Sequence, residues 1–267
     1  MARTAEAPPQ QGRGAGAALS VEGSRNLRDL GGIACADGRR LRARRVLRCG
    51  ELSGLSAEGA QQLAALRLAR IVDLRTPSER RRAPTTAAAL AEVPRWQCTT
   101  TTPGIEPQAV IPQCFASPGC TVEVMCGLYR RLPFALAEAL AALLETAVAG
   151  RAVLFHCAAG KDRTGVAAAL LLALLGARRD AILADYVASQ RVQALHEAKF
   201  VAGAWRDAAR ATPRGHWLPL LQADPRYLEA MFDAVAARHR SVAHYARDCL
   251  GQTIDIDERL REALLEW

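Results

Sequence analysis

Residues 153–165 read VLFHCAAGKDRTG, and this stretch decides the fold. Residues 153–155 are the short apolar run of a buried strand, whereas residues 164–175 are an apolar run of helical length that ends at Gly176. The string 156–165 therefore joins a strand to a helix N-terminus. Backbone N–H groups and the positive end of the helix dipole meet at such a junction and attract anions.

Outward from this stretch, strand and helix patterns alternate. Residues 46–49 and 70–74 have the apolar pattern of short buried strands, and Ser56 can cap a helix that runs to residue 68 between them. A succession of strand, helix and strand is typical of a parallel sheet. We therefore expect an α/β fold with a short, mostly parallel central sheet flanked by helices.

The rest of the chain is predicted to add helices to the same domain. Residues 134–149 are strongly helical, and proline residues separate three or four further helices downstream. The sequence shows no internal repeat and no boundary of a second domain. We predict one domain over residues 21–267, in which residues 177–267 form a helical C-terminal part.

Two stretches lack periodicity. Residues 1–20 are rich in Pro, Gln, Gly and Ala and contain no apolar h-region of a signal peptide, which predicts a flexible N-terminal tail. Residues 95–121 are rich in threonine and proline, and unstructured loops of this length are often lids or binding loops. We predict that residues 95–121 form a mobile lid or insertion loop over the site.

The composition is that of a globular protein. The 267 residues are 50% hydrophobic and 23% charged, and the longest apolar run, residues 166–177, is shorter than the roughly 18 residues that a transmembrane helix needs. We expect a cytoplasmic protein. The sequence leaves open a peripheral membrane contact, signal-less export and the oligomeric state.

The net charge is +8, and eight arginines fall between Arg25 and Arg48 against only Asp29 and Asp37. These arginines form either a solvated surface or a positive field that concentrates an anionic substrate. Aromatic residues make up only 5% of the chain, and they are not interleaved with basic residues as single-strand binders require. We therefore expect no nucleic-acid partner.

Eight cysteines are present, but no C-x2-C pair occurs and no histidine lies near the evenly spaced Cys114, Cys120 and Cys126. A zinc site and a disulfide framework are therefore not expected, and we predict no metal and no cofactor. Four further histidines lack metal-binding spacing and are assigned to the surface: His196, His216, His239 and His244. Seven cysteines read as small core or surface residues, and Cys157 is the exception.

Cys157 and Arg163 form a C-x5-R pair across the loop. Six successive backbone N–H groups can point inward as an anion nest, those of Ala158, Ala159, Gly160, Lys161, Asp162 and Arg163. The nest stabilises a thiolate at Cys157, and the planar fork of Arg163 can bind two phosphate oxygens. Cys157 would attack phosphorus and form a cysteinyl-phosphate that water then hydrolyses. The hydroxyl of Thr164 can hydrogen-bond the thiolate, and His156 is expected to orient the loop.

This string resembles the signature of the cysteine-dependent protein-tyrosine phosphatase superfamily, in particular bacterial tyrosine and phosphoinositide phosphatases similar to mycobacterial PtpB. Further blocks that resemble this family are NLRDLGG at 26–32, LRCGEL at 47–52, DLRT at 73–76 with Glu79, ADY at 184–186, and the segment from Tyr227 onward. The resemblance covers most of the chain and implies a compact α/β phosphatase fold that needs no metal. We expect Asp73 and Arg75, like Arg28 and Asp29, to form ion pairs that fix the loop.

The general acid is the point at which the chain departs from the family pattern. Members of the superfamily usually bring an aspartate from a mobile loop before the signature, but no aspartate lies between Asp73 and Asp162. The leaving oxygen still needs a proton. Asp162 is our first candidate, although the neighbouring Lys161 and Arg163 favour its ionised form. Glu106, in the expected lid, is the second candidate.

Lys161 carries separate information, because the chain has only two lysines among 35 basic residues. A compact ammonium fits beside a second phosphate where a guanidinium would crowd, which favours phosphoinositides. Its alternative role is to shape the start of the helix.

We expect a phosphomonoester hydrolase, with phosphotyrosine protein as the first substrate and phosphoinositide or phosphoserine/threonine as the second. One alternative is a pseudophosphatase that binds phosphate and scaffolds a partner. The other is a sulfur-transfer or arsenate-reducing enzyme built on a similar loop.

Overall fold

The computed structural model describes residues 17–98, 103–116 and 119–267, so most of the tail expected at 1–20 lies outside the described residues. A six-stranded sheet in the order β1-β2-β4-β7-β5-β6 forms its centre. The strands are β1 (Ala17–Ala18), β2 (Arg28–Asp29), β4 (Val46–Cys49), β7 (Val153–His156), β5 (Arg70–Asp73) and β6 (Arg95–Gln97). The last four are parallel to one another, whereas β1 and β2 add antiparallel strands at one edge. The predicted short, mostly parallel sheet is confirmed.

The parallel strands end at one level. Cys49 pairs with His156, His156 with Asp73, and Asp73 with Gln97. The carboxyl ends of β4, β7, β5 and β6 therefore form a single edge. The loops that follow these strands are brought together there, although they lie far apart in the sequence.

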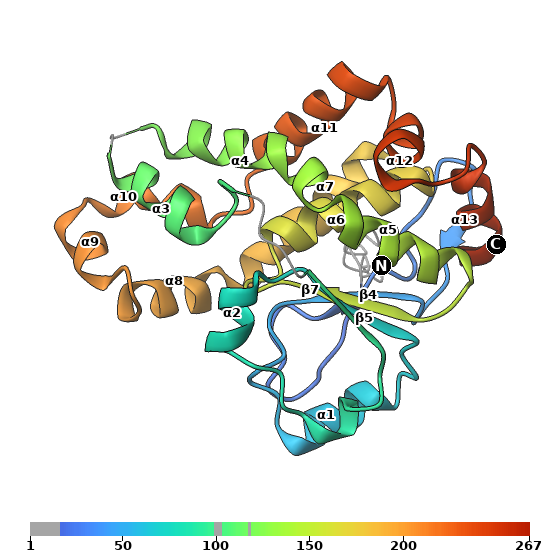
Figure 1. Cartoon of the computed structure of the whole chain (residues 1–267), viewed down its shortest axis with the longest axis horizontal. Coiled ribbons are helices and arrows are strands. Elements are labelled where there is room, and N and C mark those ends of the chain that lie inside the picture. The colour runs from blue at the N-terminus through green and yellow to red at the C-terminus, as the bar shows by residue number, and fades with distance from the viewer. Residues whose placement is uncertain (1–16, 99–102, 117–118) are drawn as a thin grey trace, which may run out of the picture.

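Helices cover both faces of the sheet, which explains why β4 and β7 are buried over their whole length. Figure 1 shows α1 on one face and the longer helices on the other. A small apolar core lies beside α1 and a larger one beneath the long helices. The helices that build these layers are α1 (Ala57–Ala64), η1 (Ala88–Leu90), α4 (Thr121–Ala135), α5 (Ala137–Val148), α6 (Asp162–Leu174), α7 (Arg179–Val187), α11 (Pro225–His239), α12 (Val242–Leu250) and α13 (Ile256–Leu264).

Two helix boundaries differ from the sequence-based expectation. Ser56 caps α1 as predicted, since its hydroxyl accepts the N–H of Gly59, but α1 ends at Ala64 rather than at residue 68. The chain turns toward β5 through Arg67, whose φ is +52°. The helix expected at 134–149 is divided at Leu136, where α4 ends and α5 begins.

The expectation that residues 95–121 lack regular structure is wrong for most of the segment. It contains β6 and the helix α3 (Pro107–Ala116), while residues 99–102 and 117–118 lie outside the described residues. Proline fits the first turn of α3, where no intrahelical donor is needed. The helix is held by tertiary packing on α4 and α10, with Val110 and Cys114 buried, rather than by a periodic apolar face. Its action as a lid stays a prediction.

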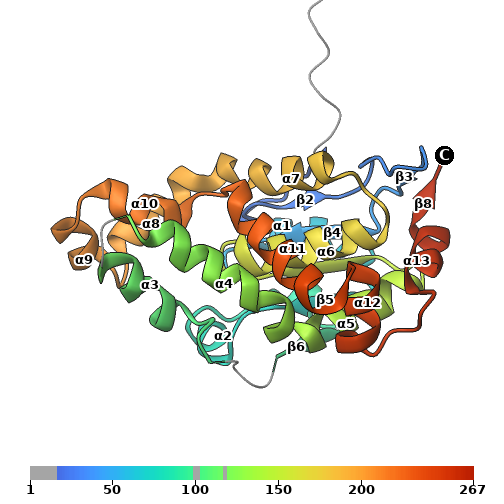
Figure 2. The same cartoon turned by 90° about the horizontal axis from the view of Figure 1, so that it is seen from above.

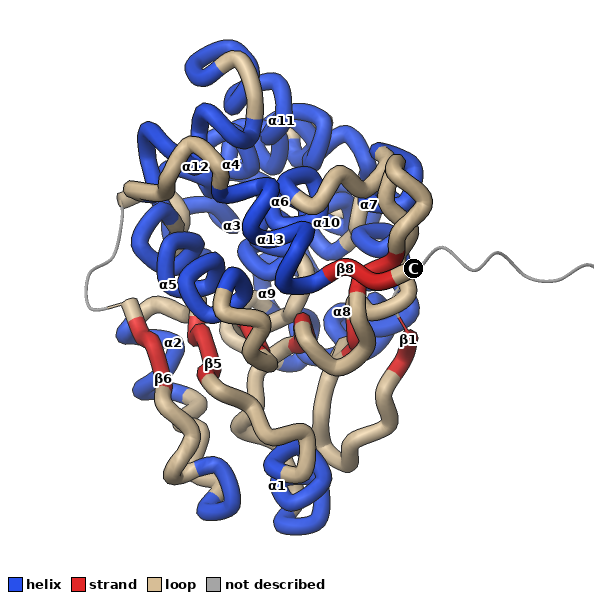
Figure 3. Tube along the Cα trace, turned by 90° about the vertical axis from the view of Figure 1, so that its right-hand side faces the viewer, coloured by secondary structure: helices blue, strands red, loops and turns tan. Residues whose placement is uncertain are grey.

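The C-terminal part is helical, as expected, and Figure 2 shows three of its helices grouped beside α3, away from the sheet. These are α8 (Gln193–Ala202), α9 (Arg206–Ala211) and α10 (Arg214–Leu221), which follow η2 (Ala188–Val192). At the opposite end of the molecule, β3 (Arg40–Leu41) pairs with β8 (Leu265–Glu266), drawn in red in Figure 3. Among the described residues, no helix has the length and apolarity to cross a membrane.

Candidate active site

The loop between β7 and α6 encloses the thiol of Cys157. This residue is 1% exposed, and its Sγ lies 3.3 Å from the N–H of Gly160 and 3.1 Å from the hydroxyl of Thr164. Both groups donate to sulfur. The predicted contact between Thr164 and Cys157 is therefore confirmed, and α6 begins at Asp162, inside the loop, rather than at residue 164.

The carbonyls of this loop are held outward by hydrogen bonds from Asn26, Arg48 and Glu51. The carbonyl of Gly160 accepts from Asn26 Nδ2 and Arg48 Nη2, each at 2.9 Å, and that of Ala158 accepts from the N–H of Glu51 at 3.0 Å. Gly160 has a φ of +71°, and a Cβ there would lie 2.6 Å from the main chain of Cys49. Only glycine fits this position. With its carbonyls turned out, the loop directs backbone N–H groups toward the sulfur.

A buried cluster of two arginines and one aspartate supports the loop from below. Arg28 Nε donates to Asp185 Oδ1 at 2.6 Å, Arg48 donates to Asp185 Oδ2, and all three residues are at most 1% exposed. Burial would raise the pKa of Asp185, but the two guanidinium groups lower it below its usual value. The cluster carries one positive charge in excess beside the loop. This charge favours an anion at the site.

Arg48 and Asp185 lie in blocks of sequence that resemble the family, but no role was predicted for them. Their contact joins residues 137 positions apart, which no local pattern indicates. The ion pair predicted for Arg28 is confirmed. Asp29 forms none in the described part of the chain: its carboxylate accepts the N–H groups of Gly31 and Arg44 instead.

Glu79 orients the guanidinium of Arg163. The two carboxylate oxygens each accept from Arg163 at 2.6 Å, through Nη1 and Nη2, and Nη1 also donates to the carbonyl of Leu74 at 3.0 Å. Burial would raise the pKa of Glu79, but the charge of Arg163 and its hydrogen bonds lower that pKa to about 2. Glu79, which the sequence marked only as part of a family block, is thus the fixed counter-ion of Arg163.

This pairing decides which edge of Arg163 can meet phosphate. A guanidinium has five N–H donors. Three are used by Glu79 and Leu74, which leaves Nε–H and one N–H of Nη2 without a protein partner in the described part of the chain. These two donors form the side edge of the guanidinium, which can still bind two oxygens of one phosphate.

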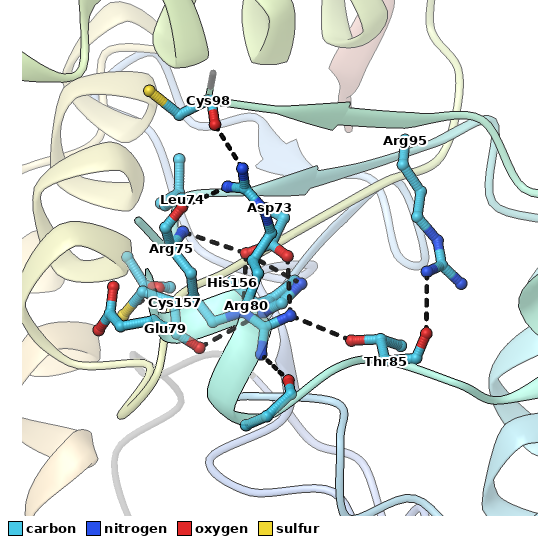
Figure 4. A network of polar contacts seen from close by, with 12 residues as sticks. Asp73, Leu74, Arg75, Glu79, Arg80, Thr85, Arg95, Cys98, His156 and Cys157 are labelled. Carbon is cyan, nitrogen blue, oxygen red and sulfur yellow. Dashed lines mark hydrogen bonds and ion pairs between the residues drawn. The ribbon is translucent and has the colours of Figure 1, made fainter. Parts of the chain in front are cut away.

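Asp73, Arg75 and His156 form a second support, shown in Figure 4. Arg75 Nε and Nη2 donate to the two oxygens of Asp73 at 2.9 and 2.8 Å, and His156 Nε2 lies 3.7 Å from Asp73 Oδ1. Burial lowers the pKa of His156, although Asp73 opposes this shift, so the ring is neutral at neutral pH. Its Nδ1 lies 3.3 Å from the carbonyl of Cys157. The predicted ion pair and the orienting role of His156 agree with this geometry.

Asp162 lies at the mouth of the loop, with a quarter of its side chain exposed. Its Oδ1 accepts from the hydroxyl of Tyr129 at 2.7 Å, and that hydroxyl lies 2.6 Å from the hydroxyl of Tyr186. Both tyrosines are buried, and burial raises their pKa values, so they stay protonated donors. No sequence pattern indicated Tyr129 as the partner of Asp162.

Lys161 differs from its expected role. Its ammonium donates to the carbonyls of Leu220 and Gln222 at 2.6 and 3.0 Å, and it lies 3.2 Å from Asp162 Oδ1. Two of the ammonium donors are used by these carbonyls, and the positive charge is paired with Asp162. The carbonyl end of α10 carries partial negative charge, which a cation stabilises. The ammonium therefore joins the loop to α10 rather than standing free for a second phosphate.

A cavity of about 160 Å³ lies beside the loop. Its polar or charged lining residues are Lys161, Asp162, Arg163 and His196, and the others are Ile105, Pro107, Val110, Ile111, Met125, Leu128, Leu132, Ala159, Phe200, Leu220 and Leu221. The cavity is thus apolar except at the loop and at His196. Its apolar walls can contact an organic group attached to a loop-bound phosphate.

Two residues near this cavity need comment. His196, expected on the surface, is half-buried in the cavity wall because α8 folds back beside the loop, and its Nε2 has no hydrogen-bond partner among the described residues. Burial lowers the pKa of His196. Glu106 does not line the cavity, and its carboxylate accepts the N–H of Gly104 at 2.9 Å.

The remaining cysteines lie apart from this chemistry. All eight are free thiols, and burial raises the pKa of Cys49 and Cys114, as expected for inert core residues. Over residues 17–98, 103–116 and 119–267, no group of His, Cys, Asp or Glu is arranged to hold a metal ion.

Comparison with known proteins agrees with this geometry. The tyrosine phosphatase family matches residues 19–266, almost the whole chain. The chain is 37% identical over 244 residues to a Cupriavidus necator protein named as a candidate tyrosine-protein phosphatase, covering 88% of this chain and 87% of that protein. It is 31% identical over 195 residues to the triple specificity protein phosphatase PtpB of Mycobacterium tuberculosis, covering 65% and 69% of the two chains. The chain therefore belongs to the tyrosine phosphatase family.

Proposed function

We propose that the protein hydrolyses phosphomonoesters through a cysteinyl-phosphate on Cys157, with phosphotyrosine in proteins as its main substrate. The observation that carries this proposal is the position of Sγ. Sulfur lies 3.3 Å from the N–H of Gly160 and 3.1 Å from the hydroxyl of Thr164, beside the oriented guanidinium of Arg163. The excess positive charge of the cluster below favours a bound phosphate.

In the first step, the thiolate of Cys157 attacks phosphorus, an S–P bond forms, and the bond from phosphorus to the leaving oxygen breaks. The side edge of Arg163 and the loop N–H groups bind the equatorial oxygens, whose charge is distributed through the transition state. In the second step, water attacks phosphorus, the S–P bond breaks, and inorganic phosphate and the thiolate are released. The hydroxyl of Thr164 stabilises sulfur as it leaves.

We assign the general acid to Asp162. It lines the cavity in which the leaving group would lie, and it is the one carboxyl group in that lining. The hydroxyl of Tyr129 fixes one of its oxygens, which leaves the other for the leaving oxygen of the substrate. Glu106 is the weaker candidate, because its carboxylate caps the turn before α3.

The apolar cavity favours an aromatic substrate over a phosphoinositide. An aromatic ring gains from burial against apolar walls, whereas a headgroup with several phosphates needs several free cations. The ammonium of Lys161 is bound to α10, and the end edge of Arg163 is bound to Glu79. We therefore propose that activity on phosphoinositides is secondary to activity on phosphotyrosine.

The decisive experiment is a substrate panel assayed with the wild type and with Cys157→Ser. We expect the order phosphotyrosine peptide, then phosphoserine peptide and phosphoinositide, and no turnover by Cys157→Ser, although this variant should still bind vanadate. Hydrolysis by Cys157→Ser would reject the covalent mechanism. A wild type that binds phosphotyrosine without turnover would indicate a pseudophosphatase.

The acid is tested by comparing leaving groups. A phenol has a pKa near 10, whereas an alcohol is much more basic and depends more on protonation. Asp162→Asn should slow phosphoserine hydrolysis far more than hydrolysis of an activated aryl phosphate. Glu106→Gln is the matched control and should slow neither. The reverse result would assign the acid to Glu106.

A further inference from the structure

A second concentration of positive charge lies at the edge opposite the catalytic loop. Arg45 precedes β4, Arg67 lies shortly before β5, and Arg151 lies shortly before β7. Because these strands are parallel, their amino ends form one edge, and the catalytic loop follows the other. The side of the molecule that carries these amino ends faces the viewer in Figure 3.

The segments at this edge surround a hollow of about 510 Å³. Its lining consists of Ala43, Arg44, Arg45, Leu66, Arg67, Leu68, Ala69, Gly150, Arg151 and Ala152. The lining holds four arginines and no acidic residue. The volume lies within the range of roughly 300–1,000 Å³ that small-molecule sites occupy.

The main chain beneath the hollow is fixed. The N–H of Val153 donates to the carbonyl of Arg45 at 2.9 Å, and the N–H of Ala69 donates to the carbonyl of Ala152 at 2.8 Å. The carboxylate of Asp29 accepts the N–H of Arg44 at 2.6 Å, so this acid holds the main chain and not the guanidinium. The arginines therefore stand on a rigid base formed by three separate segments.

The four guanidinium groups of this hollow are unneutralised. Within the described part of the chain, none of them has an ion pair or a hydrogen bond, and all four residues are exposed. Several exposed arginines elsewhere pair with a neighbouring acid, among them Arg130, Arg178, Arg206, Arg214, Arg226 and Arg247. Arg82 and Arg210 are also exposed and unpaired within the described residues, so the hollow is distinguished by the grouping of four such arginines around one space.

The backbone gives an independent indication. Arg44 and Arg67 have φ values of +60° and +52°, a left-handed conformation that costs energy for every residue with a Cβ. Four non-glycine residues in the described chain have a positive φ, and two of them line this hollow. Arginine stands at both positions where glycine would be less strained. Strain of this kind is characteristic of functional sites.

We propose that this hollow binds a compact anion with two or more phosphate groups. Guanidinium groups bind phosphate in pairs of hydrogen bonds, and four of them around one hollow can meet several phosphates at once. Such clustered phosphates occur in a phosphorylated inositol headgroup of a membrane and in free inositol phosphates. The site lies at the edge away from Cys157, so it is distinct from the catalytic site and does not deliver its ligand to the thiolate.

The sequence left open whether the arginines between Arg25 and Arg48 form a positive field that concentrates an anionic substrate. Arg28 and Arg48 are buried counter-ions of Asp185, whereas Arg44 and Arg45 line the opposite edge. Arg25 lies beside the loop but is paired with Glu51, so the run does not surround the catalytic loop with free positive charge. A protein held by this hollow on an anionic surface would direct its catalytic loop away from that surface.

The test measures binding of inositol hexakisphosphate to the full chain by calorimetry at low salt. Four proteins are compared with the wild type: Arg67→Gly, the double variant Arg45→Glu/Arg151→Glu, the catalytic-loop variant Arg163→Lys, and the control double variant Arg82→Glu/Arg210→Glu, whose arginines are exposed on α2 (Pro77–Arg82) and α9. Arg67→Gly keeps the fold because glycine accepts the positive φ. It should weaken binding by about tenfold, and the charge-reversed pair by more, because each removes charge-assisted contacts.

The control pair changes the total charge by the same amount and should alter the Kd less than about threefold. Equal loss in the control would mean nonspecific attraction and would overturn the proposal. Loss in Arg163→Lys, with none in Arg67→Gly, would place the probe in the catalytic loop and also overturn it. Absence of binding by the wild type would do the same.

A second arm distinguishes the two sources of clustered phosphate. The wild type and Arg67→Gly are sedimented with phosphatidylcholine vesicles that contain phosphatidylinositol bisphosphate. Sedimentation lost in Arg67→Gly supports the site with a lipid headgroup as ligand. Calorimetric binding without sedimentation supports it with a soluble anion as ligand.

Discussion

The two ends of the parallel strands both carry arginines, in opposite environments. At the carboxyl ends, Arg28, Arg48, Arg75 and Arg163 are at most 8% exposed, and each is bonded to a carboxylate. At the amino ends, the four arginines of the hollow are exposed and have no carboxylate partner within the described residues. The four buried arginines fix geometry, and the four arginines of the hollow face solvent. The residue type alone does not reveal which of the two a given arginine does.

The largest effect is expected when the buried cluster loses its anion. Asp185→Asn leaves Arg28 and Arg48 buried with no carboxylate, which should lower the free energy of unfolding by about 3–5 kcal/mol. Urea unfolding at pH 7 measures this. Asp180→Asn, on the same helix α7 but paired with Arg178 at an exposed position, is the matched control and should change little. If Asp185→Asn lowered the free energy of unfolding by less than about 1 kcal/mol, the inference that the buried arginines fix the geometry of the site would be wrong.

The next effect concerns pH. The pKa of Glu79 is lowered from 4.5 to about 2 in the folded protein, so its stabilising contribution is complete above the unfolded pKa and is lost as pH falls through the folded one. Glu79→Gln should be less stable than the wild type by about 3 kcal/mol at pH 7, and the difference should shrink between about pH 5 and pH 2. Unfolding curves over this range measure it. If the difference in stability between Glu79→Gln and the wild type did not change with pH, the charge of Glu79 would not be its cause.

Tyr129→Phe is expected to have a smaller effect on stability and to impair one step of the reaction, the protonation of the leaving oxygen. Loss of the hydroxyl should cost about 1–2 kcal/mol of stability, because Asp162 and Tyr186 lose a buried partner. Tyr129 acts as a positioning residue, so phosphoserine hydrolysis should fall more than aryl phosphate hydrolysis. Tyr245→Phe, which loses a buried hydroxyl bonded to the carbonyl of Pro133, is the control. Both variants should lose similar stability, but Tyr245→Phe should slow the two substrates equally.

The smallest effect is expected at the amino ends. Arg45→Glu/Arg151→Glu should shift Tm by less than about 2 °C, because exposed charges contribute little to stability. Removal of like-charge repulsion should make any shift upward at low salt, and added salt should diminish it. Thermal melts at two salt concentrations measure this. A large fall in Tm would show that these arginines support the fold.

The sequence predicted the features that depend on neighbouring residues. Strand β7, the loop after it and helix α6 follow from one continuous stretch, and the cap by Ser56 and the pair Asp73–Arg75 each lie within a few residues. Local spacing is enough to define such contacts.

The features that were missed depend on contacts across the chain. The ammonium of Lys161 bonds to carbonyls at the end of α10, about 60 positions later in the sequence. The hydroxyl of Tyr129 bonds to Asp162, which lies 33 positions later. Helix α3 was missed because tertiary packing rather than a periodic face holds it. No local pattern contains these partners, so the contact of Lys161 with α10 could not be predicted from the sequence.

One feature of the support beneath the loop bears on how the protein acquires its activity. Asn26 bonds the carbonyl of Gly160 across 134 residues, and Arg28 bonds Asp185 across 157. Contacts of such separation form slowly, because a long loop of chain must close before they stabilise anything. A nascent chain that has not yet emerged from the ribosome beyond Asp185 holds Cys157 in a loop whose support lacks its counter-ion. During synthesis, the loop should therefore stay unsupported until the later helices have folded onto the N-terminal segment.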